Sequence, residues 1–202
     1  MKRAYRPAGV SEVEEPKLAE TLFASTGAAW IWLVLRLWLG WGWLEAGWHK
    51  VSDPAWMSTG TAIQGYWARA AAMPEPPARP AITYDWYRSF IQMLLDTNSH
   101  VWFGKLIATG ETLIGIGLIV GAFVGVAAFF GGFMNLNFML AGTASTNPID
   151  LLAAVPLVLA WKVAGYYGLD RWILPALGTP WYKGWLVGGA ERQPPLAPGA
   201  PA

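Results

Sequence analysis

Residues 101–142 form a stretch of 42 residues that carries only two charged side chains. A helix needs about 20 apolar residues to cross a membrane, because the hydrocarbon core is about 30 Å thick and a helix rises about 1.5 Å per residue. A single helix over 101–142 would be about twice as long as the membrane is thick. The glycines of VGAFVG at 120–125 predict a turn instead, between one spanning helix at 101–120 and another at 124–142.

Two further apolar stretches, Ala28–Trp48 and Ile149–Tyr166, are also long enough to be spanning helices. Only 13% of all residues are charged, about half the share of an average soluble domain. We therefore expect an all-α protein, a four-helix transmembrane bundle that occupies residues 28–182. In this interpretation residues 1–27 are an extramembrane arm and residues 183–202 are a Pro-rich flexible tail.

The long connection at 49–99 joins the first predicted span to the second. Its segment MPEPPARP at 73–80 cannot be regular helix, because proline lacks a backbone donor and clashes inside a helix. On either side of this segment, TAIQGYWARAAA and YDWYRSFIQMLL mix aromatic and polar residues. Both are expected to be amphipathic helices that lie at the membrane interface.

Lysine and arginine are more frequent in the two predicted tails than in this connection, with seven against four. Four spans place both termini on the same side of the membrane. The positive-inside rule then favours the cytoplasm for both termini.

Composition excludes several classes of function. The net charge is +1 and no basic run is present, so nucleic acid is not an expected partner. The chain has no cysteine, which excludes disulfides and thiol chemistry within it. With two histidines, His49 and His100, neither a metal nor a covalently bound cofactor is expected.

The first predicted span contains Arg36, whose charge is costly in lipid unless it faces the protein interior and pairs. Glu111 is the deep carboxylate of the second span. We therefore predict an Arg36–Glu111 pair, direct or bridged by water, which either holds the bundle together or acts in catalysis. Lys50, at the end of the first span, is expected to reach toward the interface.

Glu45 and His49 are four residues apart on the first span and point away from Arg36. They are either a proton relay or a solvated contact at the interface. The third span contributes Asn135 and Asn137, whose amides must find a partner on another helix, in water or on a ligand. Asn147 is predicted to cap the fourth helix, with proline at the first helical position.

Several segments resemble the DoxX family of four-helix bacterial membrane proteins. The resemblance rests on RLWLGWGWLEAGWHK and GETLIGIGLIVG, and covers about residues 28–182. The stretches NLNFMLAGTASTNPIDLL and LAWKVAGYYGLDRWILPALGTPW are most similar to the DoxD branch, the membrane subunit of a thiosulfate:quinone oxidoreductase of prokaryotes. The resemblance implies a multi-pass protein of a bacterial or archaeal cell membrane with a link to quinones.

We weigh two functions, of which the first follows this resemblance. In the first, the chain is a quinone-linked oxidoreductase subunit, with thiosulfate as electron donor and a second subunit as partner. Arg36 and Glu111 would then be catalytic, and Trp43, Asn135 and Asn137 would contact the quinone. In the alternative, the chain is a non-catalytic accessory subunit of a larger respiratory or photosynthetic complex. The discriminating feature is whether Arg36 and Glu111 line a cavity or are sealed between packed helices.

Overall fold

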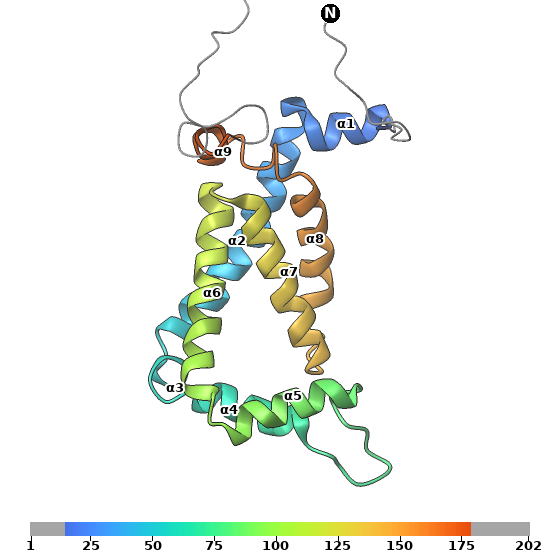
Figure 1. The fold of residues 1–202 in the computed structure, drawn as a ribbon, viewed down its shortest axis with the longest axis vertical. Helices are drawn as coiled ribbons and strands as arrows, with labels where there is room; N and C mark the ends of the chain where they lie inside the picture. The colour runs from blue at the N-terminus through green and yellow to red at the C-terminus, as the bar shows by residue number, and fades with distance from the viewer. Residues whose placement is uncertain (1–14, 179–202) are drawn as a thin grey trace, which may run out of the picture.

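The computed structural model describes residues 15–178, so most of the predicted arm and the whole predicted tail lie outside the described residues. This part of the chain is all-helical and contains no strand, which confirms the all-α prediction. The helices that stand side by side in Figure 1 are α2 (Ala29–Val51), α6 (His100–Val120), α7 (Val124–Leu140) and α8 (Asn147–Leu159).

Shorter helices lie at the two ends of this bundle. In Figure 1, α4 (Thr61–Ala71) and α5 (Asp85–Asp96) run across one end, next to the one-turn helix α3 (Pro54–Met57). The opposite end carries α1 (Lys17–Ala24) and α9 (Asp170–Ala176). The short 3₁₀ helix η1 (Thr26–Ala28) joins α1 to α2.

Helices α2 and α6 pack closely because glycines lie at their contact. A Cβ added to Gly47 would overlap the backbone nitrogen of Thr112, and one added to Gly115 would overlap that of Leu44. A Cβ on Gly40 would lie 2.9 Å from the Cβ of Leu118. Small residues let two helix backbones approach in this way, as they commonly do in membranes.

The predicted turn between the second and third long helices is confirmed. Helix α6 ends at Val120 and α7 begins at Val124. Gly121 has φ 70°, in the left-handed region that glycine adopts without strain.

The two amphipathic helices predicted in the long connection are also present, as α4 and α5. Each buries one face against the lower part of the bundle, with Ile63 and Trp67 from α4 and Tyr87, Ile91 and Leu94 from α5. Together α4 and α5 lie beneath α6 and α7, and we call this pair of helices the floor (Figure 1).

Helix α6 is the described helix that is long and apolar enough to cross a membrane alone. Helix α1 and residues Thr26–Val51 pass the same criterion together, but they are bent by 68°. Helices α7 and α8 are apolar but shorter. Helix α8 ends at Leu159, seven residues before the predicted end at 166, because the chain then turns back to pack Gly168 against Gly121.

Candidate functional site

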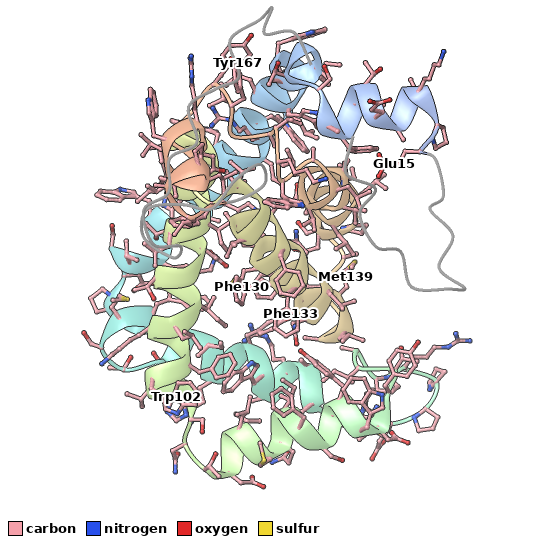
Figure 2. All side chains as sticks on the ribbon, turned by 45° about the horizontal axis from the view of Figure 1, so that its top comes forward. Glu15, Trp102, Phe130, Phe133, Met139 and Tyr167 are labelled. Carbon is pink, nitrogen blue, oxygen red and sulfur yellow. The ribbon has the colours of Figure 1, made fainter. Side chains whose placement is uncertain are left out.

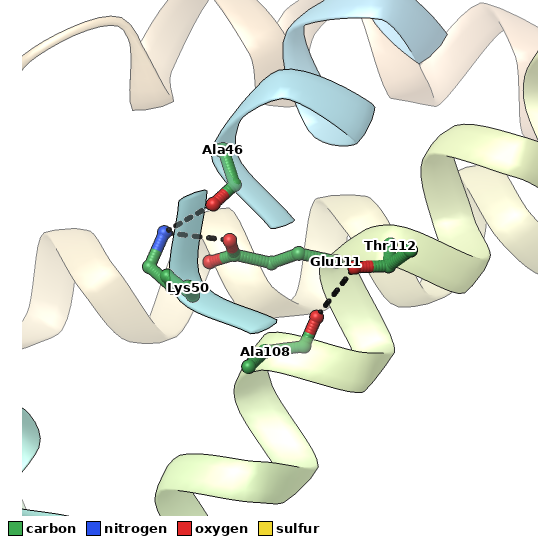
Figure 3. A network of polar contacts seen from close by, with 5 residues as sticks. All are labelled: Ala46, Lys50, Ala108, Glu111 and Thr112. Atoms are coloured by element: carbon green, nitrogen blue, oxygen red, sulfur yellow. Dashed lines mark hydrogen bonds and ion pairs between the residues drawn. The ribbon is translucent and has the colours of Figure 1, made fainter. Parts of the chain in front are cut away.

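A partly buried ion pair joins α2 to α6 (Figure 3). The ammonium of Lys50 lies 2.6 Å from Oε2 of Glu111 and also donates to the carbonyl of Ala46. The Glu111 side chain is only 2% exposed, whereas that of Lys50 is 22% exposed. The ammonium also lies 5.3 Å from the centre of the Trp56 ring. Lys50 thus connects a carboxylate inside the bundle to the surface.

The predicted Arg36–Glu111 pair is wrong, and Lys50 takes the place of Arg36. The cause is the register of the two antiparallel helices. Gly47 of α2 contacts Thr112, so the end of α2 lies beside Glu111. Arg36 lies three turns earlier on α2, beside the C-terminal end of α6.

Arg36 binds backbone carbonyls instead of a carboxylate. One guanidinium nitrogen donates to the carbonyls of Leu118 at 2.5 Å and Ile119 at 2.7 Å, and the other donates to that of Tyr167 at 2.9 Å. The last carbonyls of a helix have no partner within it and carry partial negative charge. With 1% exposure, Arg36 is sealed between helices and caps the end of α6.

Sequence reasoning missed Asp170, which lies next to this cap. Its two carboxylate oxygens accept the backbone N–H groups of Phe123 and Val124, at 2.6 and 2.9 Å, at the start of α7. Burial raises the pKa of Asp170, and the hydrogen bonds from Val124 and Phe123 and the charge of Arg36 act in the opposite direction. The segment GLDRW contains this residue, but its partners are 46 and 47 positions away.

Trp43 and Asn135 are buried donors without partners among the described residues. Trp43 is 6% exposed and Asn135 is 1% exposed, yet neither Trp43 Nε1 nor Asn135 Nδ2 makes a hydrogen bond. A Cβ on Gly131 would lie 3.2 Å from Trp43 Nε1, so the indole lies against α7.

Helix register places these donors in the same region as Glu111. Gly131 also lies against Ile114, and α6 and α7 run antiparallel. Asn135 is about one turn beyond Gly131, and Glu111 is about one turn before Ile114. Asn135 therefore lies at the level of Glu111. This level of the bundle therefore has a buried carboxylate, a partly exposed ammonium and two buried N–H donors that make no hydrogen bond within the described residues.

Asn137 points elsewhere. The hydroxyl of Tyr87 donates to the carbonyl and to the side-chain oxygen of Asn137, at 3.0 and 3.2 Å, and the amide of Asn137 donates to Phe133. Burial, with a smaller contribution from Tyr66, raises the pKa of Tyr87 to about 12. Asn137 therefore ties α7 to the floor, and the structure gives it no place beside Trp43 and Asn135.

The proposed relay residues lie outside this interior. Glu45 and His49 are both exposed on α2, and no hydrogen bond or ion pair joins them within residues 15–178. Their role in moving protons stays a prediction.

The predicted cap at Asn147 is wrong. Helix α8 begins at Asn147 itself, its N-cap position is Thr146, and no side chain caps it. The amide of Asn147 instead donates back to the carbonyl of Thr143 at 3.0 Å. This bond orients the side chain away from the first turn, so its oxygen does not receive a helix N–H.

Two further features bear on ligands. Within residues 15–178, no group of three or more metal-ligating side chains lies close enough to hold an ion. A cavity of about 420 Å³ lies at the other end of the bundle, between α7, α8 and α9, and contains none of the residues around Glu111.

No family model, curated protein or solved structure matches the chain.

Proposed function

We propose that this protein is a multi-pass integral membrane subunit of a quinone-linked oxidoreductase, with Lys50 and Glu111 as its reacting pair. The observation that carries the proposal is the Lys50–Glu111 pair, whose carboxylate is buried, at about the same level of the bundle as two donors that make no hydrogen bond within residues 15–178, Trp43 Nε1 and Asn135 Nδ2. Ionisable residues inside a membrane bundle are expensive and usually functional.

Membrane insertion is supported by the outer faces of all four long helices. Large apolar side chains project from them, and many are more than half exposed; examples are Trp38, Leu113, Phe129 and Leu152. Apolar surface of this extent is unusual on a soluble monomer. In Figure 2, Phe130 and Phe133 are labelled on α7, and both belong to this exposed set. Lipid is the partner that such a surface fits.

The donors fit a quinone head group. A quinone presents two carbonyl oxygens, which accept hydrogen bonds, and on reduction it takes up two electrons and two protons. Within residues 15–178, Trp43 Nε1 and Asn135 Nδ2 have no other acceptor. Trp43 already lies against Gly131, so a ligand would approach the donors from the side of Glu111.

Lys50 and Glu111 can supply charge and protons there. The ammonium of Lys50 donates a hydrogen bond and stabilises negative charge that develops on an oxygen nearby. Glu111 can hold a proton and pass it on. Because the Lys50 side chain is partly exposed and Glu111 is not, protons would reach Glu111 from the surface by way of Lys50. Electrons would come from a donor such as thiosulfate, through a second subunit.

The alternative function, an accessory subunit of a larger membrane complex, is favoured by the burial of Glu111 and by the position of Arg36. Glu111 is 1% exposed and does not line the cavity of about 420 Å³. Arg36 is also 1% exposed. Its three bonds to backbone carbonyls and its complete burial fit a structural role. Arg36 therefore no longer belongs to the proposed reacting pair.

The two functions are distinguished by turnover. Quinone reduction would be measured with purified protein in liposomes and thiosulfate as donor, alone and with a candidate soluble subunit. Wild type and Glu75→Gln, a control that removes an exposed carboxylate in the long connection, are expected to turn over, and Glu111→Gln is expected to lose activity by about a hundredfold or more. Activity that Glu111→Gln retains, or no activity in any combination with wild type, would favour the accessory subunit.

A further inference from the structure

The cavity at the α9 end of the bundle is apolar and opens among side chains on the outer face. It is about 420 Å³ in volume. Its walls include Phe123, Val126, Phe129, Phe130, Trp161 and Leu174. Phe129 and Phe130 are each about half exposed, so the rim of the cavity is continuous with the apolar outer face of α7. A hydrocarbon chain at that face could enter it without crossing polar surface.

Two cations are next in the chain to residues that line the cavity. Lys162 follows Trp161 in the chain and Arg171 follows Asp170, and both Trp161 and Asp170 line the cavity. Both cations are exposed, and within the described part of the chain neither makes an ion pair. The guanidinium of Arg171 lies over the ring of Tyr166, 5.2 Å from its centre.

The one carboxylate in the cavity wall does not cancel these charges. Both oxygens of Asp170 are occupied by the N–H groups of Phe123 and Val124, and Arg36 lies close enough to influence its charge. Asp170 is itself 2% exposed. The exposed charges next in the chain to the lining residues Trp161 and Asp170 are therefore both positive.

We propose that this cavity binds an acyl chain of an anionic phospholipid, whose phosphate lies between Lys162 and Arg171. The apolar walls accept a hydrocarbon chain of any lipid, and the two cations select a negative head group. An isoprenoid quinone tail could fill the same walls but would gain nothing from the cations. The inference is independent of the proposed function, since none of the residues around Glu111 takes part in it.

The test is lipid retention by the full-length protein, measured by native mass spectrometry. Protein in detergent would be given equal amounts of phosphatidylglycerol and phosphatidylcholine with identical acyl chains. Wild type is expected to retain phosphatidylglycerol preferentially. The double variant Lys162→Gln/Arg171→Gln should lose that preference, with affinity for phosphatidylglycerol falling by about thirtyfold. The matched control Arg69→Gln/Lys105→Gln removes two exposed cations elsewhere and should behave as wild type.

A second variant tests the contribution of the cavity without changing the charges. Val126→Trp adds a large side chain at the cavity wall, keeps both cations, and is expected to reduce retention of both lipids. Circular dichroism would show that each variant keeps its helical content. Equal retention of the two lipids by wild type, an unchanged preference in Lys162→Gln/Arg171→Gln, unchanged retention in Val126→Trp, or a retained mass that matches an isoprenoid quinone would each overturn the proposal.

Discussion

Arg36 and Asp170 hold the two sides of the α6–α7 turn. Arg36 donates to the last carbonyls of α6, and Asp170 accepts the first N–H groups of α7. Each residue has the charge that its helix end prefers, because the C-terminal end of a helix is partially negative and the N-terminal end is partially positive. The two residues thus stabilise the turn that connects α6 to α7.

Replacing Arg36 with methionine is expected to lower the free energy of unfolding by about 3–5 kcal/mol, the usual cost of removing one partner of a buried charged group. Three carbonyls would lose their donor, and Asp170 would lose a nearby positive charge. Thermal unfolding in detergent, followed by circular dichroism, measures the change. Arg69→Gln, which removes an exposed arginine, serves as the control and should change stability by less than about 0.5 kcal/mol. A melting temperature for Arg36→Met equal to that of the control would contradict the assignment.

Asp170 gives a prediction about pH. Burial raises its pKa above the ordinary value of 3.8, so the folded state holds this proton more tightly than the unfolded state does. The contribution of this group to stability is complete below pH 3.8 and is lost as pH rises through the raised pKa. The difference in melting temperature between wild type and Asp170→Asn should therefore depend on pH in the range just above 3.8. A difference that is constant across that range, or one that grows with pH in favour of wild type, would argue against the raised pKa.

Gly47 and Gly42, both on α2, allow a comparison of a tightly packed glycine with an open one. Gly47→Ala places a Cβ where Thr112 already lies, and we expect a loss of about 1–3 kcal/mol in the free energy of unfolding. A Cβ at Gly42 meets nothing within 4 Å, so Gly42→Ala should stabilise the helix by about 0.5–1 kcal/mol. Melting temperatures that move in opposite directions would support the α2–α6 contact, whereas two equal shifts would contradict it.

Tyr87→Phe tests how the floor is attached to α7. The variant loses the hydroxyl that donates to Asn137, at an expected cost of about 1 kcal/mol. Since the pKa of Tyr87 is about 12, its phenol should remain protonated at pH 11 in the folded protein. In an absorbance titration, wild type should show a phenol that ionises near pH 12, and this transition should be missing in Tyr87→Phe. The exposed Tyr84 provides a control, because Tyr84→Phe should leave stability unchanged. If Tyr87 ionises near pH 10, it is not buried as described.

The sequence predicted local features correctly where the cause is local. Glycine at 121 ends one helix and permits the turn to the next, and the amphipathic patterns at α4 and α5 follow from residues within each segment. The early end of α8 was not predicted, because it depends on Gly168 packing against Gly121, which is distant in the chain.

The partner of Glu111 shows the same limit. The sequence indicates that a buried carboxylate needs a cation, and α2 offers both Arg36 and Lys50. The choice between them depends on how far α2 is shifted along α6, and that shift is set by contacts such as Gly47 with Thr112. Periodicity within one helix carries no information about this shift. For the same reason, the contact of Asp170 with the start of α7 could not be read from GLDRW alone.

The central claim, that the interior around Lys50 and Glu111 binds a quinone, is tested most directly by photolabelling. A photoreactive quinone analogue would be bound to the protein in liposomes, and the labelled peptides would be identified by mass spectrometry. The account predicts labels on the segments around Trp43, Glu111 and Asn135, which Glu111→Gln reduces and Glu75→Gln, a variant of an exposed residue in the long connection, does not. Labels confined to the cavity between α7, α8 and α9, or labelling that Glu111→Gln leaves unchanged, would contradict it.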